Sequence, residues 1–218
     1  VKDDVQREQL RAQQERDMLQ AVGHEILSPL QSLMVLHPNA EDAGHRYVQR
    51  MQQAVKVLYG QASPTEALAA ATMDVATLDL DAFLAQVASN AHFAGIAHVQ
   101  YEARGEPVQV RADEFALEDV VTHVLRNADR HRAPSTPISM TLSVDDKTAT
   151  IAIHNEGPAI DPWIIDRIFE YGVSDAGQAG HRGQGLFVVR TYLAKMGGSV
   201  RARNDAGGVT FELAVPRA

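Results

Sequence analysis

The sequence predicts an α+β protein in which a pair of amphipathic helices precedes an α/β sandwich. In the first 70 residues, apolar side chains recur at spacings of three and four, which is the period of a helix with one buried face. Beyond about residue 80, short alternating patterns typical of strands are interspersed with helical ones. Most of these strands follow each other closely enough to pair as hairpins, so we expect the helices to cover one face of the sheet.

Residues 1–70 are predicted to form a two-helix hairpin. A break at residues 37–39 separates two helical segments, each with its own apolar stripe. The stripes consist of Leu19, Val22, Ile26, Leu30 and Leu33 in the first helix and of Tyr47, Val48, Met51, Ala54, Val55, Leu58 and Ala62 in the second. Because a hairpin alone leaves its apolar seam half covered, we expect two copies of the chain to form a dimeric four-helix bundle.

Residues 71–79 are expected to be a linker and residues 80–218 an α/β domain. The predicted helices cover residues 80–92, 114–131, 162–169 and 186–196. The predicted strands cover residues 99–103, 108–111, 138–144, 148–154, 199–203 and 208–215. A glycine-rich loop at residues 172–185 leads into the last predicted helix.

The composition is that of an ordinary globular protein, with 45% hydrophobic and 22% charged residues among 218. A formal charge of −8 and the lack of a basic run argue against a nucleic-acid partner. The chain has no cysteine, which fits a reducing compartment, and no apolar run long enough to cross a bilayer. We therefore expect a soluble, cytoplasmic piece without membrane contact. Since it starts at Val1 rather than at Met, we also expect an upstream sensor segment in the parent protein, whose membrane attachment stays open.

Residues 24–30, with the sequence HEILSPL, place a histidine on the polar side of the first helix. His24 lies two residues from two positions of the apolar stripe, about 200° around the helix axis, so its side chain is expected to be exposed. Pro29 cannot donate the backbone hydrogen bond that the carbonyl of Glu25 would accept, and the helix should bend just after His24. A neutral imidazole is a nucleophile, and Glu25 could accept its proton. An ordinary surface histidine beside a helix kink is the alternative.

The predicted helix at residues 114–131 has a polar flank beside its apolar face. Leu117, Val121, Val124 and Ala128 are expected to face the core, and His123, Asn127, Arg130 and His131 to line the flank. The amide oxygen of Asn127 is a suitable ligand for Mg²⁺, and the neighbouring cations could contact phosphate oxygens. A solvated helix face is the alternative.

A turn at residues 154–160, with the sequence HNEGPAI, follows a predicted strand. Gly157 permits a sharp turn and lets a flat ligand approach the backbone. Asn155 could both accept hydrogen bonds from an adenine edge and donate to it. The same residues also make an ordinary loop.

The glycine-rich loop at residues 172–185 enters a helix at its N-terminus. There the free N–H groups and the positive end of the helix dipole favour an anion, and His181 and Arg182 add charge. The loop therefore has the features of a phosphate cradle, although a merely flexible loop would share them.

In this order, the four motifs resemble the signatures of sensor histidine kinases: an H-box, an N-box and two glycine boxes, with a phenylalanine box between the last two. The resemblance covers nearly the whole chain after about residue 15. It implies a dimerisation and phosphotransfer hairpin followed by an ATP-binding domain of the GHKL superfamily. It further implies ATP and Mg²⁺ as cofactors, a homodimer formed through the hairpin, and a response-regulator receiver domain as partner.

The resemblance implies that ATP phosphorylates His24 and that the phosphoryl group then passes to an aspartate of the response regulator. It places Glu25 at the acidic position beside the phosphoacceptor, Asn127 at the Mg²⁺-binding asparagine, Arg130 and His131 opposite phosphates, and Asn155 and Gly157 in the adenine-recognition turn. It also identifies Ile168-Phe169-Glu170 as the phenylalanine box and Gly183-Gln184-Gly185-Leu186 as the second glycine box, with Arg182 beside it at the nucleotide.

Four residues depart from the family pattern. His123 stands where the family usually has the first N-box asparagine, and Ala159 replaces a glycine of the first glycine box. Asn155 stands where an aspartate normally accepts the adenine amino group, and a neutral amide is the weaker acceptor. Ser28 occupies the position commonly associated with phosphatase activity toward the partner. These departures leave open a degenerate kinase that acts as a dimeric signalling scaffold, or a protein that acts mainly as a response-regulator phosphatase.

Overall fold

The computed structural model describes residues 73–170, 173, 185–205 and 207–218, together with scattered positions of the N-terminal segment. Those positions are Ile26, Pro29, Leu30, Ser32, Leu33, Val48, Gln49, Met51, Gln52 and Val55, and each is helical. The chain divides into two compact units, Val1–Ala71 and Thr72–Ala218. Most of the predicted hairpin lies outside the described residues and stays a prediction. In the part of the chain that the structure describes, no helix is both long and apolar enough to span a membrane.

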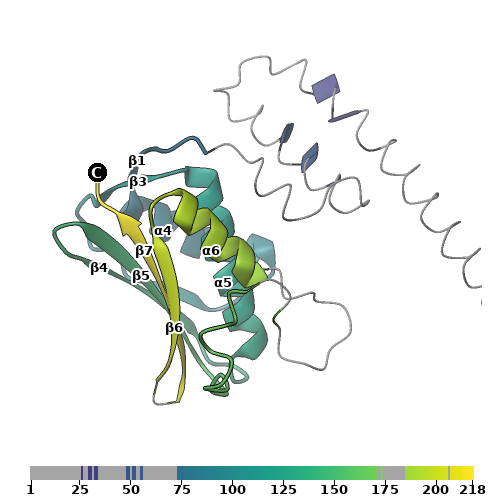
Figure 1. The fold of residues 1–218 in the computed structure, drawn as a ribbon, viewed down its shortest axis with the longest axis vertical. Coiled ribbons are helices and arrows are strands. Elements are labelled where there is room, and N and C mark those ends of the chain that lie inside the picture. Colours follow the sequence, from purple (N-terminus) through teal and green to yellow (C-terminus); the bar gives the residue numbers. More distant parts are fainter. Residues whose placement is uncertain are drawn as a thin grey trace, which may run out of the picture. The chain divides into compact units, whose positions relative to one another are not determined.

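A five-stranded sheet forms one layer of the C-terminal unit (Figure 1). In spatial order its strands are β2 (Val99–Tyr101), β4 (Ile138–Val144), β5 (Thr148–Glu156), β7 (Gly208–Pro216) and β6 (Ser199–Asp205). Strand β2 runs parallel to β4, and all other neighbours are antiparallel. A second, two-stranded sheet pairs β1 (Ala76–Asp79) with β3 (Gln109–Ala112).

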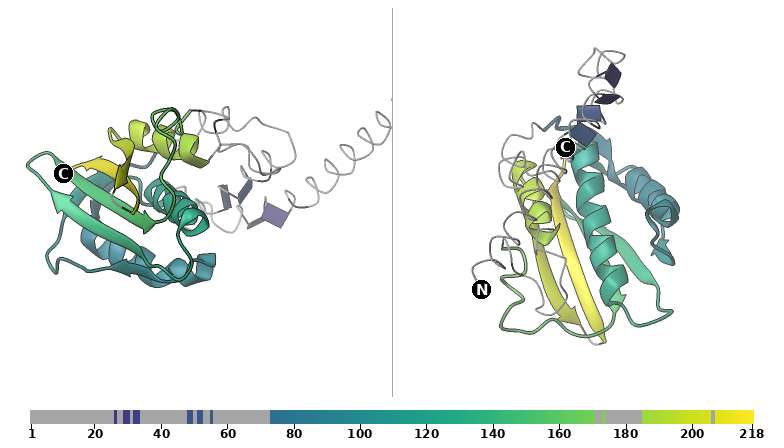
Figure 2. Two further views of the ribbon diagram at one scale, coloured as in Figure 1. Left: turned by 90° about the horizontal axis from the view of Figure 1, so that it is seen from below. Right: turned by 90° about the vertical axis from the view of Figure 1, so that its right-hand side faces the viewer.

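Three α-helices lie on one face of the five-stranded sheet (Figures 1 and 2). They are α4 (Leu80–Asn90), which continues into a short 3₁₀ helix at Ala91–Ala94, α5 (Glu114–His131) and α6 (Gly185–Lys195). The side chain of Asp79 caps α4 by accepting from the N–H of Asp81, and that of Asp113 caps α5 by accepting from the N–H of Ala116. These caps explain why both helices begin where they do.

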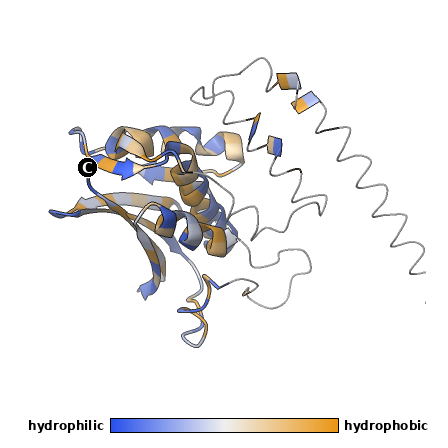
Figure 3. Ribbon diagram, turned by 45° about the horizontal axis from the view of Figure 1, so that its top comes forward, coloured by the Kyte–Doolittle hydropathy of each residue, from blue (hydrophilic) through white to orange (hydrophobic). Residues whose placement is uncertain are grey.

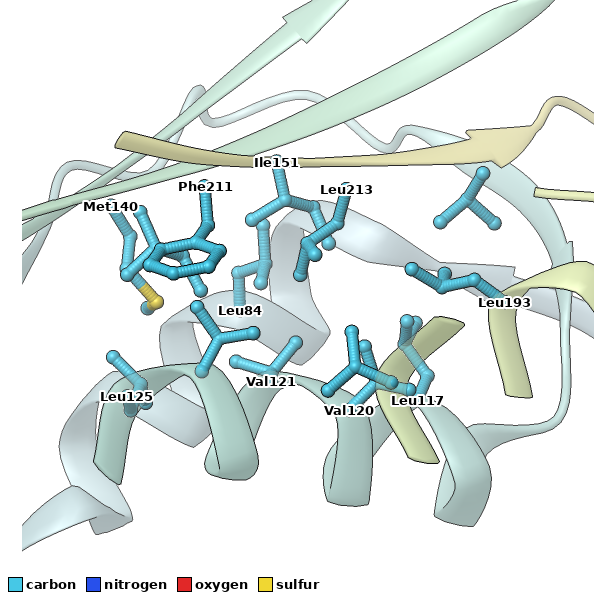
Figure 4. Close-up of a cluster of buried hydrophobic side chains, with 14 of the residues drawn as sticks. Leu84, Leu117, Val120, Val121, Leu125, Met140, Ile151, Leu193, Phe211 and Leu213 are labelled. Carbon is cyan, nitrogen blue, oxygen red and sulfur yellow. The ribbon is translucent and has the colours of Figure 1, made fainter. Parts of the chain in front are cut away.

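The core fills the space between the sheet and the helices (Figure 4). Alternate residues of β5 are buried, as the period of two requires, whereas β7 is buried at its first four residues and alternates only after them. Colouring by hydropathy shows polar and apolar residues interspersed along the elements (Figure 3). Helix α5 contributes Leu117, Val120, Val121, Val124, Leu125 and Ala128, which are all nearly inaccessible to solvent. The predicted inner face of α5 is therefore confirmed.

Most predicted elements of this unit are present within one or two residues of their predicted ends. The limits of α5 and β4 agree with the prediction, and β5 continues two residues further, to Glu156. Strand β1 was not predicted, because its residues fall in the segment expected to be a linker. The α+β class with helices on one face of the sheet is confirmed.

The predicted helix at residues 162–169 is wrong, because these residues form a series of turns. The N–H of Ile165 reaches back four residues to Asp161, but the next bonds, from Arg167 to Ile164 and from Glu170 to Arg167, span only three. A continuous α-helix needs the four-residue bond at every step. The chain instead curls so that Phe169 enters the core.

Candidate functional site

The end of β5 and the end of α5 meet at a glycine. Gly157 has a φ of +153°, and a Cβ there would lie less than 3.0 Å from the carbonyl oxygen of His131, closer than Cβ atoms come in real proteins. The N–H of Ala133 donates to the carbonyl of Glu156 at 2.7 Å, and the N–H of Gly157 donates to the carbonyl of Gly207 at 3.0 Å. Only glycine fits this position, because the backbone at the end of β5 passes very close to the backbone at the end of α5.

Asn155 lies on the inner face of β5, directly before this turn, and only 2% of it is exposed. Its Nδ2 donates to the carbonyl of Glu156 at 3.3 Å, whereas its Oδ1 accepts no hydrogen bond from any described residue. A buried amide oxygen without a donor costs about 1–3 kcal/mol. Among the described residues, the Oδ1 of Asn155 thus has no donor, and it could accept from the donor group of a flat ligand such as a purine base.

The polar flank of α5 presents groups that are available to a ligand. Asn127 is half-buried and Arg130 exposed, and within the described ranges neither side chain forms a hydrogen bond or an ion pair. The neighbouring Arg132, in contrast, is engaged by Asp129 at 2.7 Å and by the carbonyl of Thr136 at 2.6 Å. As far as the described residues go, the guanidinium of Arg130 could therefore meet phosphate oxygens, and the amide oxygen of Asn127 could bind a cation.

The first turn of α6 lies beside the same flank. A Cβ at Gly185 would stand 3.5 Å from Nδ1 of His123, so the start of α6 approaches the middle of α5. Leu186 is half-buried and packs against the core. The first N–H groups of an α-helix have no partner within the helix, so the start of α6 favours an anion at this place.

The surroundings of His123 favour its neutral form. Burial lowers its pKa below the ordinary 6.5, and the positive charge of Arg126 lowers it further, while the carboxylate of Asp119 opposes both. A neutral imidazole at this position adds no positive charge to the start of α6.

Asn204, near the end of β6, binds the turn that follows Gly157, a contact that the sequence did not indicate. Its Oδ1 accepts from the N–H of Ile160 at 2.9 Å, and its Nδ2 donates to the carbonyl of the same residue at 2.8 Å. The signal that could have found it is a polar residue where the apolar stripe of Val200 and Ala202 predicts another apolar one.

The predicted phenylalanine box anchors the segment that leads away from the site. Ile168 and Phe169 are buried, and the ring of Phe169 meets that of Phe211 edge to face, with 6.2 Å between centroids. Arg167 and Glu170 form an ion pair on the surface. The two apolar residues thus fix the segment to the sheet.

Five of the predicted site residues lie outside the described part of the chain, and their roles stay predictions. They are His24, Glu25, Ser28, Arg182 and Gly183. The remaining residues, from Asn127 to Leu186, come from three elements that the fold brings together: α5, the end of β5 and the start of α6. Their arrangement offers a buried acceptor at one end and free polar groups with a helix N-terminus at the other.

Residues 112–218 match the model of the family described as "Histidine kinase-, DNA gyrase B-, and HSP90-like ATPase". The chain is 28% identical over 144 residues to the "Probable sensor histidine kinase TcrY" of Mycobacterium tuberculosis. That alignment covers 64% of this chain but only 30% of TcrY, so the chain spans less than a third of this relative.

Solved structures of histidine kinases share the fold. The "Mycobacterial sensor histidine kinase MprB" superposes with a TM-score of 0.57 at 23% identity, over 65% of this chain and 98% of that one. Full-length ShkA, solved in complex with AMPPNP, superposes with a TM-score of 0.60 at 24% identity, over 93% of this chain and 46% of that one. The C-terminal unit therefore shares its α+β fold with these proteins.

Proposed function

Because residues 112–218 belong to the histidine kinase-, DNA gyrase B- and HSP90-like ATPase family and the chain is a relative of sensor histidine kinases, we propose that it is the catalytic core of a protein histidine kinase. It uses ATP to phosphorylate His24 and passes the phosphoryl group to an aspartate of a response regulator. The proposal rests on one observation. The fold brings together α5, the end of β5 and the start of α6, and the polar side chains of Asn127, Arg130 and Asn155 lie there with unused hydrogen-bonding groups among the described residues.

ATP lies across this set with its two ends in different surroundings. At the base end, which consists of Asn155, Gly157 and the turn to Ile160, the open Oδ1 of Asn155 accepts from the adenine amino group. At the phosphate end, which consists of Asn127, Arg130 and the start of α6, the free N–H groups and the guanidinium meet phosphate oxygens. His131, Arg182 and Gly183 complete the phosphate end. Asn127 would hold a Mg²⁺ ion, which neutralises phosphate charge.

Phosphoryl transfer asks the protein mainly for positioning. A ring nitrogen of His24 forms a bond to the γ-phosphorus while the bond from that phosphorus to the bridging oxygen breaks and ADP leaves. Glu25 accepts the ring proton. The phosphoryl group then moves from the ring to a carboxylate oxygen of the receiver domain, which docks on the helices near His24.

Exposed apolar side chains in the N-terminal unit support pairing of two chains. Ile26, Leu33 and Met51 are 37%, 40% and 45% exposed, although they belong to the apolar stripes of the predicted hairpin. A second copy that covers these stripes would remove the exposed surface. The proposed kinase is therefore a homodimer.

Labelling from γ-labelled ATP tests the proposal. The wild-type chain should acquire acid-labile label, and His24→Gln should acquire none while it still binds a fluorescent ATP analogue. His92→Gln, which changes an exposed histidine of the C-terminal unit, is the matched control and should label as the wild type does. A folded, nucleotide-binding wild-type protein that never acquires label would contradict kinase activity.

One residue favours a second candidate, a degenerate kinase that signals as a dimeric scaffold. The buried acceptor at the base end is the neutral amide of Asn155, which binds an amino group less strongly than a carboxylate does. The same labelling experiment separates the two functions, because a scaffold pairs normally without acquiring phosphorus. Release of phosphate from a phosphorylated receiver, abolished by Ser28→Ala, would instead indicate a phosphatase.

A further inference from the structure

We propose that Asn204 is a positioning residue for recognition of the adenine base, an inference that rests on the proposed function. Asn204 lies on β6, far in sequence from every motif of the nucleotide site, and its carboxamide binds both backbone groups of Ile160. Ile160 ends the turn that begins at Gly157. The side chain therefore acts on the shape of the base end without itself being one of the groups that meets the nucleotide.

The position of Asn204 on the strand shows why its carboxamide points toward this turn. Along β6, Val200 and Ala202 alternate with exposed arginines and pack against the core, so they face the helices. Asn204 is the next residue of this inner face. An asparagine there needs partners for both of its polar atoms, and Ile160 supplies an N–H and a carbonyl at hydrogen-bonding distance.

The turn is held at both of its ends by the same hairpin. The N–H of Gly157 donates to the carbonyl of Gly207 in the β6–β7 connection, and Ile160 is bound by Asn204 at the end of β6. Between these two points, Pro158 and Ala159 are exposed. Without Asn204 the far end of the turn would lose its hydrogen bonds to β6 and would be held only by the half-buried side chain of Ile160, which packs against the core.

The hairpin that provides these bonds is itself fixed to β5 on the opposite face of the sheet. The hydroxyl of Thr210 donates to the carboxylate of Asp205, and Nδ1 of His154 lies 2.9 Å from the same hydroxyl oxygen. This chain of contacts ties the end of β6 across β7 to β5. The β6–β7 hairpin is thus tied to β5, and Asn204 connects the hairpin to the turn.

The two hydrogen bonds of Asn204 are exposed to solvent, so their loss should loosen the turn more than it destabilises the unit. A looser turn lowers the affinity for a ligand that must fit against it. Because Asn155 and the turn contact the base in the proposed complex, the loss of Asn204 should lower the preference for adenine over guanine and should leave the binding of the phosphates unchanged.

Competition binding against a fluorescent ATP analogue tests the inference in the whole chain. For Asn204→Ala we expect ATP to bind roughly fivefold more weakly, the equivalent of one net hydrogen bond, with little change for GTP, so that the ATP-to-GTP ratio narrows. Asn204→Asp retains an acceptor for the N–H of Ile160 and should recover part of the ratio. Asn90→Ala, an exposed asparagine at the end of α4, is the matched control and should leave the ratio unchanged.

The affinity ratio does not depend on the fraction of folded protein, so a purely structural role of Asn204 would leave it unaltered. Hydrogen exchange at the N–H of Ile160 provides a second measurement, and it should accelerate in Asn204→Ala. If the wild-type chain prefers ATP and Asn204→Ala has the same ATP-to-GTP affinity ratio, this inference is wrong but the proposed function is not. A wild-type chain that binds neither nucleotide would overturn the proposed function, and the inference with it.

Discussion

The two ends of the candidate nucleotide site are held in different ways. At the base end, backbone groups are bonded to backbone or side chain on all sides: Gly157 to Gly207, Ile160 to Asn204, and Glu156 to Ala133. At the phosphate end, the side chains of Asn127 and Arg130 have no partner among the described residues. The first end is built to a fixed shape, which suits a rigid base, and the second offers free polar groups, which suit a charged and hydrated chain of phosphates.

The largest effect should come from breaking the shape of the base end with Gly157→Ala. The added Cβ would clash with the carbonyl of His131, and alanine disfavours the φ of +153°. We expect the free energy of unfolding in urea to fall by roughly 2–4 kcal/mol and nucleotide binding to be lost.

Gly105→Ala separates the clash from the backbone strain. Gly105 has a φ of +76°, and no atom lies within 4 Å of the Cβ that alanine would add. This control should therefore cost only about 1–2 kcal/mol and should leave nucleotide binding intact. If Gly105→Ala and Gly157→Ala lost the same free energy of unfolding and the same nucleotide affinity, the close contact between Gly157 and α5 would not be important.

The phosphate end should respond in the opposite manner, with a loss of activity at unchanged stability. Asn127→Ala removes a side chain that has no hydrogen bond to a described residue, so the free energy of unfolding should change by less than about 0.5 kcal/mol. If Asn127 holds Mg²⁺, the rate of labelling from ATP should fall about a hundredfold, since a metal ion supplies several kcal/mol of charge stabilisation. Asn90→Ala serves as the control. A normal labelling rate in Asn127→Ala would contradict the assigned role.

The same contrast explains which parts could be predicted from sequence. Asn127, Asn155 and Gly157 are recognisable because each lies in a local motif, and α5 because Asp113 caps it and its apolar residues keep a period of 3.6. The bonds that shape the base end are not local. Asn204 and Ile160 are 44 residues apart, so no pattern in either segment reveals their pairing.

Strand β1 was missed for the same reason. Its four residues are partly exposed, and it pairs with β3, whose residues lie 30 to 36 positions further along the chain. The turns at residues 162–169 were mistaken for a helix because Ile164, Ile168 and their neighbours have helical spacing, yet the burial of Phe169 governs the backbone there. In both cases tertiary contacts, rather than the local sequence pattern, determine the secondary structure.

The smallest effect should come from Asn155→Asp, which replaces the amide at the base end by a carboxylate of the same shape. A carboxylate accepts from the adenine amino group more strongly than an amide does, so ATP should bind about fivefold more tightly. Burial of the charge opposes this gain, because only 2% of Asn155 is exposed, and the variant should unfold at a slightly lower urea concentration. Asn90→Asp adds the same charge away from the site and controls for the general effect of a negative charge on ATP binding. Equal or weaker binding of ATP by Asn155→Asp, relative to Asn90→Asp, would mean that the open Oδ1 does not meet the adenine amino group, and that shape alone selects the ligand at this end.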